Sequence, residues 1–420
     1  MTEPVVADPA KRAFFTGSVP KHDAKNAASA AESLTDPAAI RPFRVSFRTD
    51  AFVDLHRRLA ATRWPDESPV DSWAQGVPLA KAKAVIDYWA HRYDMTRVQR
   101  RLNSFPQFCT RIDDLDIHFI HVKSRHPDAL PVVITHGWPG SVIELLDLIA
   151  PLVDPTKHGG AADDAFDVII PSLPGFGFSE KPTEAGWGLP RIARAWAVLM
   201  QRLGYTNYVA QSGDLGAGVS NWMADQQPAG LKAIHLNLPM VFPPPPPGPE
   251  GFSAPEKTTI AQLNHIYADM SGYAFIQDTK PQTLSYGLTD SPAGQALWIF
   301  EKFQEWTDNH GDATDALSMD RMLDNITLYW MTQTAGSAAR LYKESFKKDF
   351  TRISISVPTA ITVFKGDIFT PPKVWAERTY SNLIYWNEVK KGGHFAAFEQ
   401  PLAVVKELRI SMRAFRRDQS

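Results

Sequence analysis

A short turn motif, Gln211–Gly216, carries the side chain with the clearest chemical potential in this chain of 420 residues. The motif reads Q-S-G-D-L-G, follows the apolar run Tyr208–Ala210 and precedes a helix-like segment. Small residues at Ser212 and Gly216 allow a sharp strand-to-helix turn that presents a nucleophile, here the carboxylate of Asp214. A carboxylate nucleophile attacks a carbon that bears a leaving group and forms an alkyl ester. The pattern favours opening of an epoxide or displacement of a halide, and an Asp in a surface turn is the simpler alternative.

His394 is the candidate base for the second half of such a reaction. It follows two glycines in K-G-G-H-F, and these allow a tight turn that exposes the imidazole. Asp367 follows the buried-strand pattern Thr359–Phe364, and its carboxylate is expected to hold Nδ1–H of the imidazole. The chain order nucleophile, acid, histidine is typical of α/β-hydrolases. A helix-capping role before Pro371 is the alternative for Asp367.

Composition excludes several classes of partner. Lys and Arg number 44 against 46 Asp and Glu, so the net charge of −2 does not indicate a nucleic-acid partner. The single cysteine, Cys109, cannot form an intrachain disulfide and fits a reducing compartment.

No apolar run reaches the ~20 residues that span a bilayer, and the N-terminus lacks the apolar core of a secretory signal. We therefore expect a soluble, cytoplasmic protein without an obvious membrane anchor.

Strand-like and helix-like patterns alternate along the chain, which indicates a mostly parallel sheet with helices on both faces. Strands are expected at Phe43–Phe47, Phe108–Ile112, Ile117–Val122, Leu130–Thr135, Phe166–Ile170, Tyr208–Ala210, Ala233–Leu238, Thr359–Phe364 and Leu383–Trp386. Helices are expected at Asp50–Ala61 (with Asp50 as N-cap), Lys81–Tyr93, Val142–Pro151, Leu189–Leu203, Val219–Gln226, Thr258–Ser271, Ala293–Thr307, Met319–Tyr329 and Pro401–Phe415.

These patterns divide the chain into five segments. Residues 1–39 read as a poorly ordered extension with a short helix near 24–34. Residues 40–129 precede the first buried strand, and 130–241 form the first part of a sheet domain. The proline run Pro243–Pro247 marks an exit from that domain, because proline lacks the N–H that a central strand needs. A helical segment, 242–349, interrupts the sheet pattern, which resumes over 350–420.

Several motifs taken together resemble the microsomal-type epoxide hydrolases of the α/β-hydrolase superfamily. They are the N-terminal meander from Ile40 to Val122, the loop H-G-W-P-G-S from His136, the Asp214 turn and the segment G-G-H-F-A-A-F-E from Gly392. The similarity runs from about Ile40 to Leu402. It implies an α/β-hydrolase fold, a helical cap, a meander over 40–129 that wraps the core, and conversion of an epoxide to a vicinal diol through an ester of the Asp.

The resemblance also implies roles for further residues. Backbone N–H groups of Trp138 and Leu215 are expected to form an oxyanion hole. The cap segments S-G-Y-A-F-I-Q-D-T-K-P and R-L-Y-K-E match family segments that hold two epoxide-binding tyrosines, which places these at Tyr273 and Tyr342. The substrate pocket is expected to include His136, Pro139, Phe176 and Phe395. The partners are a small apolar epoxide and water, with no metal or cofactor required and a homodimer possible.

Two rival functions share parts of the pattern. A haloalkane dehalogenase commonly places a Trp after the nucleophile, whereas Leu215 has no side-chain N–H to stabilise a halide. A non-catalytic binding protein of the same fold would typically lack members of the triad, and this chain has all three. The sequence departs from the family pattern in three respects. Residues 1–39 are not apolar enough for the N-terminal membrane anchor that the resemblance to the mammalian members implies, Leu215 stands where Trp or Ile is frequent, and Asp367 stands where some members have Glu.

Overall fold

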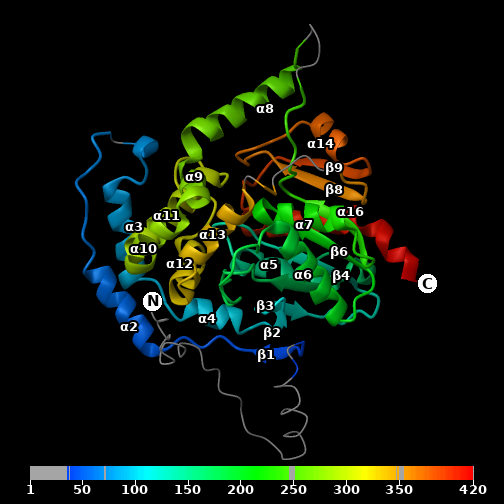
Figure 1. Ribbon diagram of the computed structural model, residues 1–420, viewed down its shortest axis with the longest axis horizontal. Coiled ribbons are helices and arrows are strands. Elements are labelled where there is room, and N and C mark those ends of the chain that lie inside the picture. The colour runs from blue at the N-terminus through cyan, green and yellow to red at the C-terminus, as the bar shows by residue number, and fades with distance from the viewer. Residues whose placement is uncertain are drawn as a thin grey trace, which may run out of the picture.

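A nine-stranded sheet forms the centre of the molecule (Figure 1). The structure, a computed structural model, describes residues 36, 38–70, 72–245, 251–346, 348–349 and 354–419, so the helix expected near 24–34 lies outside the described residues. The strand order is β1-β2-β3-β5-β4-β6-β7-β8-β9. The strands are β1 Arg41–Phe43, β2 Gln107–Ile112, β3 Leu115–Val122, β4 Leu130–Thr135, β5 Phe166–Pro171, β6 Tyr208–Ser212, β7 Leu231–Leu236, β8 Thr359–Phe364 and β9 Leu383–Val389.

The sheet is antiparallel at one end and parallel over the rest. Neighbours from β1 to β5 in this order are antiparallel, and neighbours from β5 to β9 are parallel. The central strands β4 and β8 are buried along their whole length, as their apolar runs predict for strands covered on both faces. The helices of the sheet domain are α5 Leu146–Val153, α6 Leu189–Arg202, α7 Asp214–Gln226, α14 Lys373–Thr379, α15 Ala396–Glu399 and α16 Pro401–Ser411. The predicted α/β-hydrolase fold is confirmed.

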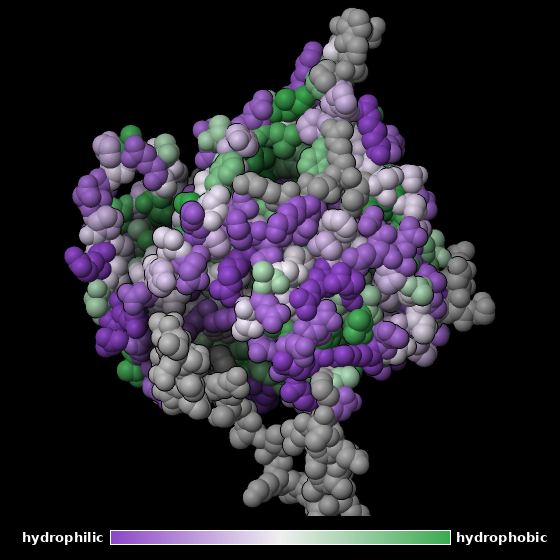
Figure 2. Space-filling model, in the orientation of Figure 1, coloured by the Kyte–Doolittle hydropathy of each residue, from purple (hydrophilic) through white to green (hydrophobic). Residues whose placement is uncertain are grey.

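Six α-helices lie between β7 and β8 in the chain, and we call them the cap. They are α8 Ala254–His265, α9 Gly272–Thr279, α10 Pro281–Asp290, α11 Pro292–Trp306, α12 Met319–Thr332 and α13 Ala335–Ser345, with a π-helical turn at Ile266–Met270. In Figure 1 the cap lies beside the sheet, with α8 projecting at the top. Figure 2 shows a mostly hydrophilic face on which apolar side chains gather in a hollow between α8 and α14.

The N-terminal helices pack against the cap. They are α2 Thr49–Ala60, α3 Leu79–His91 and α4 Arg97–Leu102. The indole N–H of Trp89 donates to the hydroxyl of Thr327 in α12. The fully buried carboxylate of Asp324, also in α12, pairs with Arg97 and Arg101 of α4. A buried carboxylate is stable only when it is paired in this way, so these contacts fix α12 against the N-terminal segment.

Some expected boundaries were wrong for local reasons. Of the expected strand Phe43–Phe47, only Phe43 belongs to a strand, because β1 spans Arg41–Phe43. Beyond Phe43, the backbone N–H groups of Val45 and Phe47 donate to the side-chain oxygens of Asn103 and Gln99. These N–H groups therefore bond to side chains and not to a neighbouring strand, although the sequence alternates as in a strand.

Helix starts and ends also differ from the expectations. Asp50 is not the N-cap of its helix; it lies in the first turn, where a negative charge is favourable, and it pairs with Arg48. Val142–Leu145 forms a 3₁₀ turn before α5, and α7 begins at Asp214, five residues before the expected start. The last helix ends at Ser411 and a 3₁₀ segment, Arg413–Gln419, follows.

Strand β2 and the turn after it show two local features. Asp113 and Asp114 both have positive φ in the turn between β2 and β3, which is typical of a tight hairpin. Burial raises the pKa of the Cys109 thiol to about 12, which fits a packed and unreactive side chain.

In the part of the chain that the structure describes, no helix is both long and apolar enough to cross a membrane.

Candidate active site

The turn between β6 and α7 presents Asp214 in a strained conformation. Its φ is +48°, which is uncommon for a residue other than glycine and is characteristic of functional turns. The turn also needs two glycines. A Cβ on Gly216 would lie 2.3 Å from the carbonyl oxygen of Thr135, and one on Gly137 would lie 2.1 Å from Oδ1 of Asp214. Gly216 of the motif and Gly137 of the loop after β4 are therefore both required, because this loop, the end of β4 and the start of α7 approach each other closely.

Gly216→Ala is expected to destabilise the protein by about 1–3 kcal/mol, because the added methyl group meets backbone that cannot move aside. Equilibrium unfolding in denaturant measures the change. The matched control is Gly287→Ala in α10, where the methyl group would meet nothing within 4 Å. That exposed helical position is expected to gain about 0.5–1 kcal/mol. Equal stability of the two variants would contradict this account of the turn.

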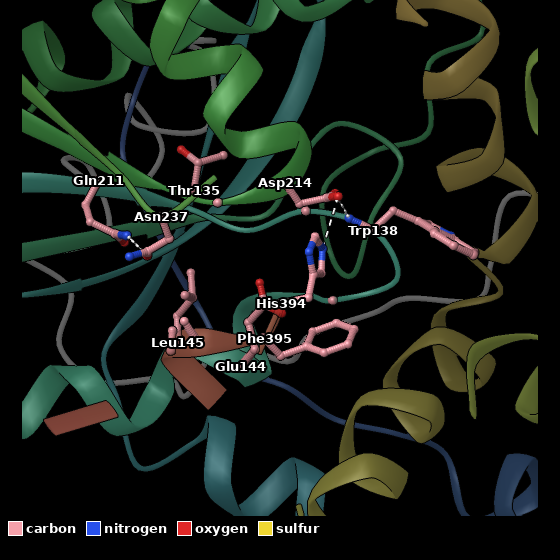
Figure 3. A pocket seen from close by; sticks show the side chains of 14 residues that line it. Thr135, Trp138, Glu144, Leu145, Gln211, Asp214, Asn237, His394 and Phe395 are labelled. Carbon is pink, nitrogen blue, oxygen red and sulfur yellow. Dashed lines mark hydrogen bonds and ion pairs between the residues drawn. The ribbon is translucent and has the colours of Figure 1, made fainter. Parts of the chain in front are cut away.

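Asp214, His394 and Asp367 form a connected series, and Figure 3 shows its first two members, Asp214 and His394. His394 Nε2 lies 3.3 Å from Asp214 Oδ2, and His394 Nδ1 lies 3.1 Å from Asp367 Oδ1. The side chains of His394 and Asp367 are each 4% exposed, and that of Asp214 is 21% exposed. Burial by itself lowers the pKa of His394, but the carboxylates of Asp367 and Asp214 outweigh it and hold the pKa well above its ordinary value. Both carboxylates therefore favour the protonated form of the imidazole.

The expected oxyanion donors lie beside Asp214. The N–H of Trp138 donates to Asp214 Oδ1 at 2.8 Å. Leu215 is the second residue of α7, where backbone N–H groups have no partner within the helix. The helix N-terminus also favours negative charge at this point. The structure therefore places the N–H of Trp138 at the carboxyl group that would become an ester, and the N–H of Leu215 is the next one along the chain from Asp214.

The two cap tyrosines lie against the indole of Trp138. Tyr273 of α9 stacks on it with ring centroids 4.8 Å apart, and Tyr342 of α13 meets it edge-on at 5.8 Å. The two tyrosine rings are 5.8 Å apart. Burial raises the pKa of both phenols, so both are protonated hydrogen-bond donors at neutral pH. Tyr267 and Tyr286, by contrast, are each 70% exposed.

Of the four expected pocket residues, the structure brings Phe395 to a cavity beside Asp214 and His394. His136 and Phe176 do not line this cavity: they are buried behind the loops, with their rings 5.4 Å apart. Pro139 does not line it either, and its carbonyl accepts a hydrogen bond from Asn325 of α12. This small cavity is not the whole surrounding of Asp214, so the substrate-pocket roles of His136, Pro139, Phe176 and Phe395 stay predictions.

The ring of His136 joins two loops. Burial lowers its pKa to about 4, so the ring is neutral. Its Nδ1 lies 3.0 Å from the carbonyl of Gly137, and its Nε2 accepts a hydrogen bond from the N–H of Leu173. A neutral ring that donates from Nδ1 satisfies both contacts and ties the His136 loop to the loop after β5.

Sequence reasoning missed Glu399, which holds the loop of His394. Its carboxylate accepts from the N–H groups of Asp308, Gly393 and Phe395. Burial raises its pKa to about 7. Its place in the segment G-G-H-F-A-A-F-E was the available signal, since a carboxylate five residues after a loop histidine can reach back to the loop's N–H groups.

Glu144 was also missed. It follows the loop H-G-W-P-G-S and lines the same cavity as Asp214 and His394.

Among the described residues, no group of His, Cys, Asp and Glu side chains is arranged to hold a metal ion.

Comparisons with known proteins identify the family of this chain. A family model described as the epoxide hydrolase N terminus matches residues 40–145, and one described as the alpha/beta hydrolase fold matches residues 131–401. A protein of Stigmatella aurantiaca (strain DW4/3-1) named "Putative epoxide hydrolase" is 55% identical over 377 residues, which is 90% of this chain and 86% of that protein. Epoxide hydrolase 1 of Oryctolagus cuniculus is 34% identical and covers 88% of each chain.

Solved structures give the same result. The epoxide hydrolase of Aspergillus niger superimposes with a TM-score of 0.80 at 31% identity, and the match covers 90% of this chain and 97% of that one. The juvenile hormone epoxide hydrolase of the silkworm Bombyx mori gives 0.82 at 30% identity, with 93% and 98% covered. The resemblance found in the sequence is confirmed, and the chain belongs to the microsomal-type epoxide hydrolases of the α/β-hydrolase fold.

Proposed function

We propose that this epoxide hydrolase opens a small apolar epoxide through a covalent ester of Asp214 and then hydrolyses that ester with water activated by His394. The observation that carries the proposal is the placement of Asp214. One carboxylate oxygen is held by the N–H of Trp138, and the other lies 3.3 Å from the imidazole of His394. A carboxylate held in this way can attack a carbon atom of the epoxide, and its ester then lies beside the histidine that activates water for hydrolysis.

In the first half-reaction, the phenols of Tyr273 and Tyr342 donate hydrogen bonds to the oxirane oxygen. Oδ2 of Asp214 attacks a ring carbon, the C–O bond of the ring breaks, and the oxygen takes a proton from a tyrosine. The tyrosines and Asp214 both lie beside Trp138, which supports this arrangement. General acid assistance of this kind contributes typically ~10²–10⁴-fold.

In the second half-reaction, water attacks the carboxyl carbon of the ester and gives a proton to Nε2 of His394. Asp367 stabilises the imidazolium that forms, 3.1 Å from Nδ1. The N–H groups of Trp138 and Leu215 stabilise the oxyanion, a contribution of about 3 kcal/mol per donor. The C–O bond to the diol then breaks, and the diol oxygen takes the proton that His394 holds. The proton left on the Asp214 carboxyl group returns to the tyrosinate, so Asp214 is again a carboxylate.

The preference for an apolar substrate rests on the aromatic surroundings of Asp214. Trp138, Tyr273, Tyr342 and Trp306 pack around one another, and the ring of Trp306 lies 5.0 Å from that of His394. Aromatic side chains bury large apolar areas and leave few groups to bind a charged ligand. The homodimer expected from the sequence stays a prediction, which sedimentation or light scattering would test.

Tyr273→Phe and Tyr342→Phe are each expected to slow ester formation by ~10–100-fold, because each removes one donor to the oxirane oxygen. The double variant is expected to be slower than either. Rapid-quench measurement of ester formation checks this, and Tyr286→Phe on the exposed surface of α10 is the matched control. Unchanged ester formation in both single variants would remove the tyrosines from the proposed mechanism.

Intact-protein mass spectrometry after rapid quenching tests the proposal itself. With styrene oxide, a mass increase equal to one substrate on the peptide that contains Asp214 is expected within the first turnover. Diol formation with no adduct at any time before the first turnover is complete would argue against the ester. A parallel assay for chloride released from 1-chlorobutane is expected to show none, because Leu215 offers no side-chain donor to a halide.

A further inference from the structure

A small cavity lies beside the Asp214–His394 pair. Its volume is about 30 Å³, and its lining includes Glu144, Gln211 and Asn237 but neither cap tyrosine. Figure 3 shows Gln211 and Asn237 on one side of the pair and Trp138, against which the tyrosines pack, on the other. A polar cavity needs only ~10–15 Å³ to hold a water molecule. This one has room for one or two.

Three buried polar atoms on the lining residues have no hydrogen-bond partner: Gln211 Oε1, Asn237 Nδ2 and His394 Nε2. Gln211 and Asn237 do bond to each other, through Gln211 Nε2 and Asn237 Oδ1 at 2.7 Å. His394 Nε2 is at ion-pair distance from Asp214 without hydrogen-bond geometry. Buried polar groups are almost always satisfied, by protein or by ordered water. Water in this cavity would satisfy all three.

Glu144 contributes a carboxyl group to the same cavity. It lies in the 3₁₀ turn Val142–Leu145, and its side chain runs back along the preceding loop. A Cβ on Gly140 would lie 2.1 Å from its Oε2. Burial, and next the charge of Asp214, raise the pKa of Glu144 to about 8. Near neutral pH the group is therefore largely protonated, with both a donor and an acceptor for water.

We propose that this cavity is the binding site of the hydrolytic water, and that Glu144 positions that water for attack on the ester. This inference rests on the proposed ester mechanism. The water oxygen forms a bond to the carboxyl carbon of Asp214, and one of its protons passes to His394 Nε2. Its other hydrogen is held by the carboxyl oxygen of Glu144. The bond between that carbon and the diol oxygen then breaks, the diol oxygen takes the proton from His394, and the acid proton of Asp214 returns to the tyrosinate, so atoms and charge balance with no further reactant.

The arrangement separates the two half-reactions in space. The epoxide approaches Asp214 from the side of the tyrosines, and water is stored on the side of Glu144. Once Asp214 is an ester, its negative charge is gone, and one cause of the raised pKa of Glu144 is removed. Glu144 then becomes a better hydrogen-bond acceptor at the stage when the water must be held.

The test measures the two half-reactions separately. Wild type, Glu144→Leu and Glu144→Gln are mixed with styrene oxide, quenched at intervals and examined by intact-protein mass spectrometry. We expect Glu144→Leu to form the ester at a rate within ~3-fold of wild type and to hydrolyse it ~10–100-fold more slowly, because the water loses its orienting partner. Glu144→Gln keeps an acceptor and a donor and is expected to restore most of the hydrolysis rate.

Controls keep the outcome clear. Glu377→Gln, an exposed change on α14, is the matched control and should alter neither rate. If Glu144→Leu does not fold, Gln211→Met tests the same water, with hydrolysis expected to slow ~3–10-fold. Equal slowing of both steps, or no slowing of hydrolysis, would overturn the role of Glu144 while leaving the ester mechanism intact. Absence of an ester in wild type would overturn both.

Discussion

Asp214→Asn is expected to lower kcat/KM for epoxide opening by at least ~10⁴-fold, because an amide is a very weak nucleophile and the ester step has no substitute. The substitution should leave the structure intact. Asn tolerates a positive φ as well as Asp does, and its carbonyl oxygen can still accept from the N–H of Trp138. Steady-state diol formation measures the loss, and the adduct should also disappear.

Asp225→Asn is the matched control for this experiment. It makes the same chemical change in the same helix, at an exposed position, and is expected to keep full activity. Because Asn in a turn can deamidate back to Asp, the Asp214→Asn protein is to be checked by peptide mass before assay. Substantial activity in a preparation free of Asp at this position would show that Asp214 is not the nucleophile.

His394→Gln is expected to trap the ester. Ester formation does not need a base, so it should continue, while hydrolysis should fall by ~10²–10⁴-fold. The expected result is rapid consumption of one epoxide per enzyme molecule, followed by almost no turnover. Rapid-quench product analysis combined with intact mass measures both phases.

The electrostatics of the site explain why histidine becomes a base only at the right stage. In the free enzyme the pKa of His394 is well above its ordinary value, because two carboxylates stabilise the imidazolium. Ester formation neutralises Asp214 and removes one of those charges. The pKa of His394 then falls, and the neutral imidazole can accept a proton from water. Loss of both ester formation and hydrolysis in His394→Gln, in a folded protein, would contradict this division of roles.

The sequence predicted the triad because the three residues follow strands of one parallel sheet. Asp214 follows β6, Asp367 follows β8 and His394 follows β9, and the carboxyl ends of parallel strands meet at one edge. Local patterns and chain order were therefore enough to bring Asp214, Asp367 and His394 together. The roles of these residues in the reaction remain predictions that the variants above address.

Other parts of the site depend on packing that local patterns do not encode. Tyr273 and Tyr342 reach Trp138 only because the cap folds back over the sheet edge, and without the family resemblance each would have read as a core tyrosine. Glu399 and Glu144 act through a loop and a cavity made by segments far apart in the chain. The ring of Phe176 is fully buried, and its place on the substrate-pocket wall stays a prediction.

A single turnover in ¹⁸O-labelled water, with enzyme in excess over styrene oxide, tests the ester mechanism most directly. The account predicts an unlabelled diol and ¹⁸O in the peptide that contains Asp214, because water attacks the carboxyl carbon of the ester. Label in the diol after that one turnover would mean that water attacks the epoxide directly, and the mechanism proposed for Asp214 would be wrong.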